Sequence, residues 1–173
     1  MTTNKLITDL QQLNQASEQA AETFLLQCCN SKRWATSLVS SRPFYDLSSL
    51  LKLSDLAWQH CNEADFLEAF QGHPKIGDLN ALKNKYAHQA SAEQGQVRQA
   101  SESVLKTLKQ RNEEYEKKFG FIFIVCASGK SAEEMLGLLE QRLKQNYADE
   151  IATGAEEQNK ITRLRLTQYL TSN

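Results

Sequence analysis

The chain has 173 residues, of which 40% are hydrophobic and 24% are charged, and its formal net charge is −1. This length and composition are typical of a soluble globular protein, and we expect a single domain over residues 1–173. The near-neutral charge argues against nucleic acid as the main partner, because phosphate binding needs a basic excess. The longest apolar run, 121–127, is far too short to cross a membrane.

The four cysteines, Cys28, Cys29, Cys61 and Cys126, form no C-x-x-C pair. The first twelve residues are mostly polar, contain no continuous apolar stretch and do not resemble a signal peptide. We therefore expect reduced thiols and a cytoplasmic location instead of a disulfide framework. Cys126 lies in an apolar run, where a cysteine is more often a packing residue than a nucleophile.

Only two Pro and seven Gly interrupt the chain, so long helices are expected. Apolar periodicity and capping signals predict the following segments as helices: 17–29, 31–40, 46–60 (capped by Asp46 or Ser48), 62–72, 79–90, 91–118, a helix opened by the capping box Ser131–Glu134, and a final helix from Gly154 to Leu170.

The run 121–127 is rich in β-branched and aromatic residues, as strands are. No second run of this kind exists to pair with it, and a lone strand leaves its backbone groups unpaired. We therefore expect a buried helical or extended segment there. The fold class expected is all-α, a single-domain multi-helix bundle.

The most informative motif is the stretch His73-Pro74-Lys75-Ile76-Gly77-Asp78. Pro74 fixes its own φ and moves His73 away from helical geometry, and Gly77 permits a turn. A histidine held rigidly at a break between helices is a candidate for proton transfer, because its unperturbed pKa lies nearest neutrality. Alternatively, Pro74 simply opens the next helix and His73 only precedes it.

Two further charged residues have both a structural and a functional interpretation. Glu93 falls in the first turn of a predicted helix, where the helix dipole alone favours a carboxylate. Arg165 lies between Ile161 and Tyr169 on one helical stripe. There its guanidinium either extends to water or binds an anion, and its planar fork suits a carboxylate substrate.

Other motifs fail on inspection. The residues Ser128-Gly129-Lys130-Ser131 match the end of the phosphate-binding Walker A motif. The first glycine of that motif would fall at position 124, which is isoleucine. The three histidines lack the spacing of metal ligands.

Taken together, the motifs resemble those of the OHCU decarboxylase (2-oxo-4-hydroxy-4-carboxy-5-ureidoimidazoline decarboxylase) family. The resemblance covers essentially the whole chain and rests on these features in order: the motif 73–78, then Glu93-Gln94, then Phe119 to Phe123 continuing into Val125-Cys126-Ala127, then Leu164-Arg165-Leu166.

The resemblance implies an all-α bundle of the OHCU decarboxylase type that uses no metal or organic cofactor. It implies the last step of urate degradation, in which OHCU loses CO₂ and gives (S)-allantoin. It also implies a homodimer. Of the catalytic residues, His73 would be the acid, Glu93 its partner, and Arg165 a ligand for the anionic substrate.

The same resemblance implies which residues line the substrate site. Besides the catalytic residues these are Pro74, Ser91, Gln94, and the backbone of Val125, Cys126, Ala127, Ser128 and Gly129. One position departs from the family. A serine is frequent three residues before the glutamate, where this chain has Ala90, and Ser91 follows one residue later.

Two alternatives remain open at this stage. The Ala90 departure is compatible with a decarboxylase of a related carboxylated heterocycle. A non-catalytic helical interaction module would instead tolerate substitution of His73 and Arg165 and would expose an apolar stripe.

Overall fold

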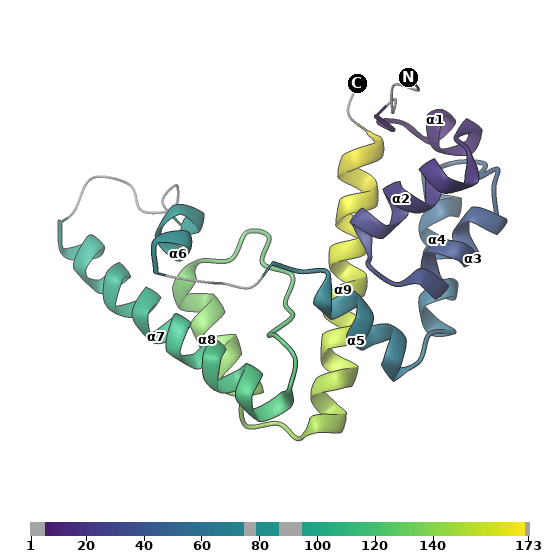
Figure 1. Cartoon of the computed structure of the whole chain (residues 1–173). Helices are drawn as coiled ribbons and strands as arrows, with labels where there is room; N and C mark the ends of the chain where they lie inside the picture. Colours follow the sequence, from purple (N-terminus) through teal and green to yellow (C-terminus); the bar gives the residue numbers. More distant parts are fainter. Residues whose placement is uncertain (1–5, 75–78, 87–94, 172–173) are drawn as a thin grey trace. The chain divides into compact units, whose positions relative to one another are not determined.

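The computed structural model describes residues 6–74, 79–86 and 95–171. Within these ranges the regular elements are helices, and the only β-type pairing is an isolated bridge between Asp9 and Thr171. The expected all-α class is confirmed. The helices in chain order (Figure 1) are α1 (Leu10–Gln15), α2 (Glu18–Cys28), α3 (Lys32–Ser40), α4 (Leu47–Gln59), α5 (Glu63–Gln71), α6 (Leu79–Tyr86), α7 (Gly95–Phe119), α8 (Ala132–Arg142) and α9 (Tyr147–Leu170).

The chain forms two compact units. Unit 1 comprises residues 1–72 and 154–173, and unit 2 comprises residues 73–153. Helix α9 begins in unit 2 and continues into unit 1, so its two parts have different neighbours. No helix in the described part of the chain combines the length and apolar character that a membrane span needs.

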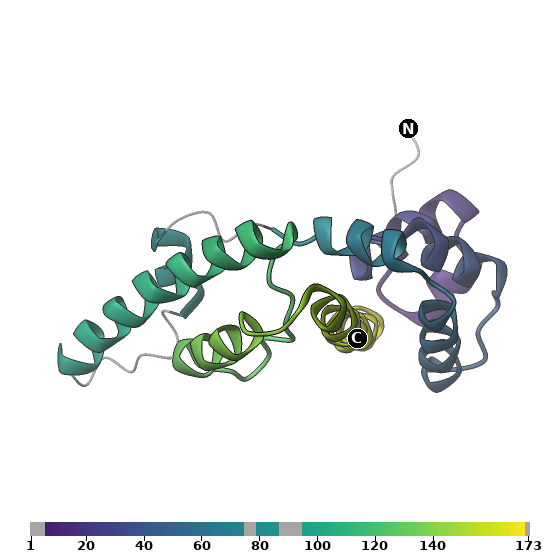
Figure 2. The same cartoon turned by 90° about the horizontal axis from the view of Figure 1, so that it is seen from below.

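Unit 1 has a continuous apolar core between α2, α3, α4 and the C-terminal part of α9. Its largest fully buried side chains include Trp34, Leu25, Leu38, Leu50 and Leu166. Two views show α9 running beside α2 and α4 (Figures 1 and 2). The tryptophan N–H groups find partners inside this core, as buried polar groups must. Trp34 donates to the Ser54 hydroxyl at 3.1 Å, and Trp58 donates to the Ala155 carbonyl at 2.9 Å.

The predicted helix starts agree with the observed caps at α2, α3, α4, α5 and α8. Asn62 and Asp65 form a reciprocal capping box at α5. Ser131 and Glu134 do the same at α8. Asp46, and not Ser48, caps α4 by accepting the Ser49 N–H at 2.7 Å. The box expected at Ser91–Gln94 and the end of the predicted helix 79–90 lie outside the described residues.

One boundary was predicted wrongly, and one short helix was missed. The final helix does not start after Gly154 but at Tyr147, where the Asn146 side chain accepts the Asp149 N–H at 2.8 Å. Gly154 lies inside α9. A glycine is needed at this position because a Cβ there would lie only 2.9 Å from the Phe70 Cζ. Helix α1 has only six residues, with Leu10 and Leu13 as its apolar members and Leu13 alone buried, so it is too short for apolar periodicity to reveal it.

Unit 2 contains α7 with α6 and α8 packed against it, and the segment 121–130 connects α7 to α8 (Figures 1 and 2). This segment has no regular secondary structure. Of the two conformations left open for 121–127, the helical one is therefore excluded, and only Phe121 and Ile124 of this run are buried. An aromatic cluster holds its first part, since the Phe121 ring lies 5.8 Å from Tyr115 and 5.9 Å from Tyr147.

The two helical glycines Gly154 and Gly137 should respond oppositely to alanine. At Gly137, in α8, a Cβ would meet nothing within 4 Å, so Gly137→Ala should raise the free energy of unfolding by about 1 kcal/mol through helix propensity. At Gly154 overpacking against the buried Phe70 costs about 1–3 kcal/mol, which exceeds that gain. Gly154→Ala should therefore lower stability. Urea unfolding followed by circular dichroism checks both, and equal stabilisation would contradict the close approach.

Candidate functional site

His73 lies directly after the C-terminus of α5. The helix ends at Gln71, and the N–H of the following Gly72 donates to the Ala69 carbonyl at 3.1 Å. Gly72 passes so close to Asn30 that a Cβ on it would lie 2.4 Å from the Asn30 Cβ. The His73 side chain is half-buried, and Pro74 is exposed. The predicted break in the helix before Pro74 is confirmed, because α5 stops two residues before His73.

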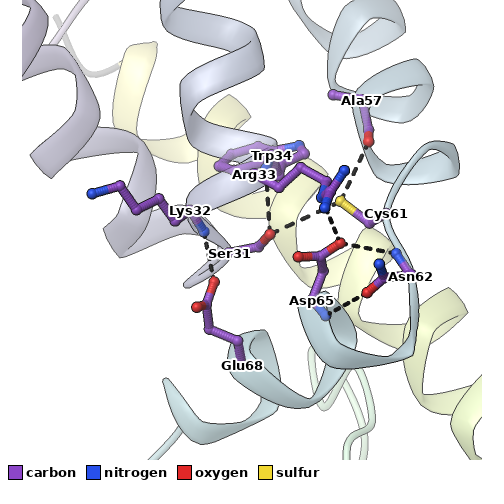
Figure 3. Close-up of polar contacts among 9 residues, drawn as sticks. All are labelled: Ser31, Lys32, Arg33, Trp34, Ala57, Cys61, Asn62, Asp65 and Glu68. Carbon is purple, nitrogen blue, oxygen red and sulfur yellow. Dashed lines mark hydrogen bonds and ion pairs between the residues drawn. The ribbon is translucent and has the colours of Figure 1, made fainter.

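Polar contacts with the start of α3 hold α5 in place within unit 1 (Figure 3). The backbone N–H of Lys32 donates to the Glu68 carboxylate at 2.7 Å, and Arg33 pairs with Asp65 at 2.9 Å. The Asn30 side chain also donates to the Glu68 carbonyl at 3.2 Å. The α5 carboxylates thus meet the N-terminus of α3, where unpaired N–H groups favour negative charge. The residue that precedes His73 is therefore fixed by hydrogen bonds and by close packing.

Arg165 lies on the unit 1 part of α9, next to the C-terminus of α2. Its Nη1 donates to the carbonyl oxygens of Gln27 at 3.4 Å and Cys28 at 3.3 Å. A guanidinium at this position is favoured by the partial negative charge of a helix C-terminus. The residues Ile161, Arg165 and Tyr169 line the edge of the buried face, since each of them is partly exposed or exposed. The centre of that face is formed by Ala155, Gln158, Thr162, Leu166 and Leu170.

The predicted lining segment Val125 to Gly129 lies at the exposed end of the connection between α7 and α8 in unit 2. The side chains of Val125, Cys126 and Ala127 are partly buried, and Ser128 and Gly129 are exposed. A turn closes the segment, in which the Lys130 N–H donates to the Ala127 carbonyl at 3.0 Å. Gly129 adopts a φ of +73°, a left-handed conformation that favours glycine. Backbone groups at such a turn can reach a small ligand.

A buried polar cluster in unit 2 was not anticipated from the sequence. The Arg142 Nε donates to the fully buried Glu150 carboxylate at 2.8 Å, and the Tyr115 hydroxyl donates to the same carboxylate oxygen. Burial and this hydrogen bond raise the pKa of the Tyr115 hydroxyl, so it remains a donor. The available signal was periodicity, because Arg142 falls on the buried face of α8 with Met135 and Leu139.

The cysteines of unit 1 are poor nucleophile candidates. Burial raises the pKa of both Cys28 and Cys29 to about 12. Burial also raises the pKa of Cys61, whose Sγ lies 3.9 Å from the Ser31 hydroxyl (Figure 3). A thiol must ionise to attack, so these three side chains serve packing.

The remaining predicted site residues, Ser91, Glu93 and Gln94, lie outside the described residues, as does Ala90. Of the others, Arg165 belongs to unit 1, while His73, Pro74 and Val125 to Gly129 belong to unit 2. The joining of His73, Glu93 and Arg165 in one site is therefore a proposal. Among the described residues, no cluster of His, Cys, Asp and Glu has a geometry that could hold a metal ion.

The chain matches a model of the family described as OHCU decarboxylase over residues 14–167, a region that runs through both units. It is 36% identical to the uric acid degradation bifunctional protein TTL of Arabidopsis thaliana over 82% of this chain, although it spans only 44% of that protein. It is 26% identical to a 2-oxo-4-hydroxy-4-carboxy-5-ureidoimidazoline decarboxylase of Haloferax volcanii, covering 94% of this chain and 96% of that protein.

Solved structures agree with these relationships. An OHCU decarboxylase crystallised in the presence of (S)-allantoin superimposes with a TM-score of 0.71 and is 32% identical, covering 91% of this chain and all of that one. An (S)-allantoin synthase has a TM-score of 0.68 at 17% identity, covering 95% of this chain and 54% of that one, and therefore supports the fold alone.

The exposure of the four thiols predicts their order of reaction with Ellman's reagent. Cys126 should react first in the native protein, because its side chain is only partly buried and those of Cys28, Cys29 and Cys61 are buried. The other three should react at full rate only in guanidinium chloride. A Cys126→Ser variant should lack the early phase, and a second fast equivalent in the native protein would contradict the assignment.

Proposed function

Because this chain belongs to the OHCU decarboxylase family, we propose that it converts OHCU to (S)-allantoin with loss of CO₂. The observation that carries the proposal is the family match over residues 14–167, which includes the positions of His73, Glu93 and Arg165. The decarboxylase relative of similar length and the solved decarboxylase support it.

We propose that His73 is the general acid of this reaction. As the bond between C4 of the substrate and its carboxylate breaks, CO₂ leaves and the electron pair moves into the adjacent carbon–nitrogen double bond of the ring, which gives an enol at C4. A hydrogen bond from His73 would stabilise the developing charge on the ring; transfer of its proton to C5, the carbon that bears the ureido group, together with loss of the C4 hydroxyl proton to form the carbonyl, would complete allantoin. Delivery of that proton to one face only would give a single enantiomer. The rigid end of α5 at Gly72 supports such a role, because a general acid must be held in position.

Glu93 and Arg165 would assist without taking part in bond breaking. A carboxylate beside His73 would orient the imidazole and favour its protonated form. The Arg165 guanidinium would bind the anionic substrate through its planar fork. The Arg165 Nη1 donates to the carbonyl oxygens of Gln27 and Cys28. These hydrogen bonds hold the side chain at a defined place beside the C-terminus of α2.

Contacts to the heterocycle would come from Pro74, Ser91, Gln94 and the turn from Val125 to Gly129. The positive φ of Gly129 and the exposure of Ser128 support a turn whose backbone approaches a ligand closely. The heterocycle itself accepts the electrons, so this scheme requires no cofactor.

The proposal is limited to this one activity. The chain spans 44% of the plant bifunctional relative, so the further activities that its name implies are not transferred. A homodimer is a proposal that rests on the family resemblance, and a cytoplasmic location is a proposal that rests on the four free cysteines.

The proposed reaction is tested by adding the purified protein to freshly generated OHCU and recording circular dichroism. Spontaneous decay gives racemic allantoin, which has no signal. We expect rapid appearance of the (S)-allantoin signal, which requires both decarboxylation and protonation on one face. Folded protein that leaves only the slow, silent decay would contradict the proposed function.

Variants of His73 and Arg165 should separate chemistry from binding in the same assay. His73→Asn should lower kcat by at least about 100-fold, because the proton donor is lost. Arg165→Lys keeps the charge but loses the fork, and it should raise KM about tenfold with a smaller change in kcat. Far-UV spectra of both variants serve as the folding control. Near-normal kcat in folded His73→Asn would exclude His73 as the acid.

A further inference from the structure

The buried pair Arg142 and Glu150 lies at the point where three parts of unit 2 meet. Arg142 is at the end of α8, Glu150 is in the first turn of α9, and Tyr115 is near the end of α7. Arg142 has a relative exposure of 8%, and Glu150 and Tyr115 have none. All the described contacts of this cluster lie inside unit 2.

Arg142 also binds the connecting segment directly. Its Nη1 donates to the backbone carbonyl oxygen of Ile124, while its Nε donates to Glu150 at 2.8 Å. The guanidinium carbon lies 4.6 Å from the centre of the Phe123 ring, a cation–π geometry. One side chain therefore contacts two consecutive residues of a segment that has no regular secondary structure.

These contacts end where the proposed substrate-lining backbone begins. Ile124 is buried at 2% exposure, and from Val125 onward the side chains become partly buried and then exposed. Lys130, which follows the turn, donates its ammonium to the Cys126 carbonyl at 2.8 Å and its backbone N–H to the Ala127 carbonyl at 3.0 Å. The stretch 125–129 thus lies between the Arg142 contact to Ile124 on one side and Lys130 on the other.

Stability alone does not account for this arrangement. A buried ion pair contributes little net stability, because desolvation of both charges offsets their attraction, and well-packed apolar residues frequently serve as well. Within the described residues, Arg142 Nη2 and Glu150 Oε2 have no hydrogen-bond partner, which adds to the cost. What the guanidinium provides is geometry. Its rigid fork can donate to a carboxylate and to a backbone carbonyl at fixed positions, and a lysine ammonium cannot match both.

We propose that Arg142 is a positioning residue for the decarboxylase site. Anchored by Glu150 and Tyr115, it fixes the Ile124 carbonyl and thereby sets the backbone of residues 125–129 against the substrate. This inference rests on the proposed function for its catalytic consequence, but the placement of the backbone can be measured independently of activity.

The experiment compares Arg142→Lys with Leu139→Ala. Leu139 is fully buried on the same face of α8, so its truncation destabilises unit 2 without removing the contact to Ile124. Backbone amide spectra by ¹⁵N NMR and steady-state kinetics are recorded well below the unfolding temperature. Arg142→Lys should shift the amides of 125–129 and lower kcat/KM about 10- to 100-fold per folded enzyme, because small misplacements have large effects. Leu139→Ala should leave both readouts near wild type.

Glu150→Gln provides a second variant in case Arg142→Lys does not fold. The amide oxygen still accepts from Arg142 and Tyr115, but the charge that anchors the guanidinium is lost. We expect shifts of the same amides and a loss in kcat/KM of about tenfold.

The outcomes separate this inference from the proposed function. Unshifted 125–129 amides in the Arg142 and Glu150 variants, or an equal kinetic loss in Leu139→Ala, would overturn the positioning role. Absence of OHCU turnover in the wild-type protein would overturn the proposed function, whereas the amide shifts would still report whether Arg142 places the segment.

Discussion

The contact between the Phe70 ring and the backbone of α9 at Gly154 determines how unit 1 is built. A Cβ at position 154 would lie 2.9 Å from the ring, so only glycine allows α5 to approach α9 this closely. Trp58 uses the next residue of α9, donating to the Ala155 carbonyl. Helix α5 is therefore held between α9 and the start of α3, and it ends at Gln71, two residues before His73. The position of the proposed acid follows from packing that contains no catalytic group.

Local signals in the sequence predicted much of this architecture. Helix starts were recognisable because side-chain caps act within four residues, as at Asn62 and Ser131. The end of α5 was recognisable because proline restricts the residue before it. Features that depend on partners far along the chain were missed or misplaced. Gly154 was interpreted as a helix boundary. The residue that requires a glycine at this position, Phe70, is 84 residues away in the sequence and gives no local signal.

The candidate site divides in the same way. His73 and Arg165 were selected from motifs and from the family resemblance, and the structure adds what holds each of them locally. The cluster of Arg142, Glu150 and Tyr115 could not be selected in this manner, because a charged residue on a helix is usually exposed and its burial depends on tertiary contacts. Helical spacing puts Arg142 on the same face of α8 as Met135 and Leu139, but no nearby residue identifies Glu150 as its partner.

The composition of unit 1 from two separate stretches of chain has a consequence for biosynthesis. Its core includes Leu25 and Trp34 from the first stretch and Ala155, Leu166 and Leu170 from the last. During synthesis every residue of unit 2 leaves the ribosome before α9 is complete. Until then, the apolar side chains of α1 to α5 that pack against α9 in the folded protein lack that partner. Unit 1, which begins the chain, therefore completes its core only after unit 2 has been synthesised.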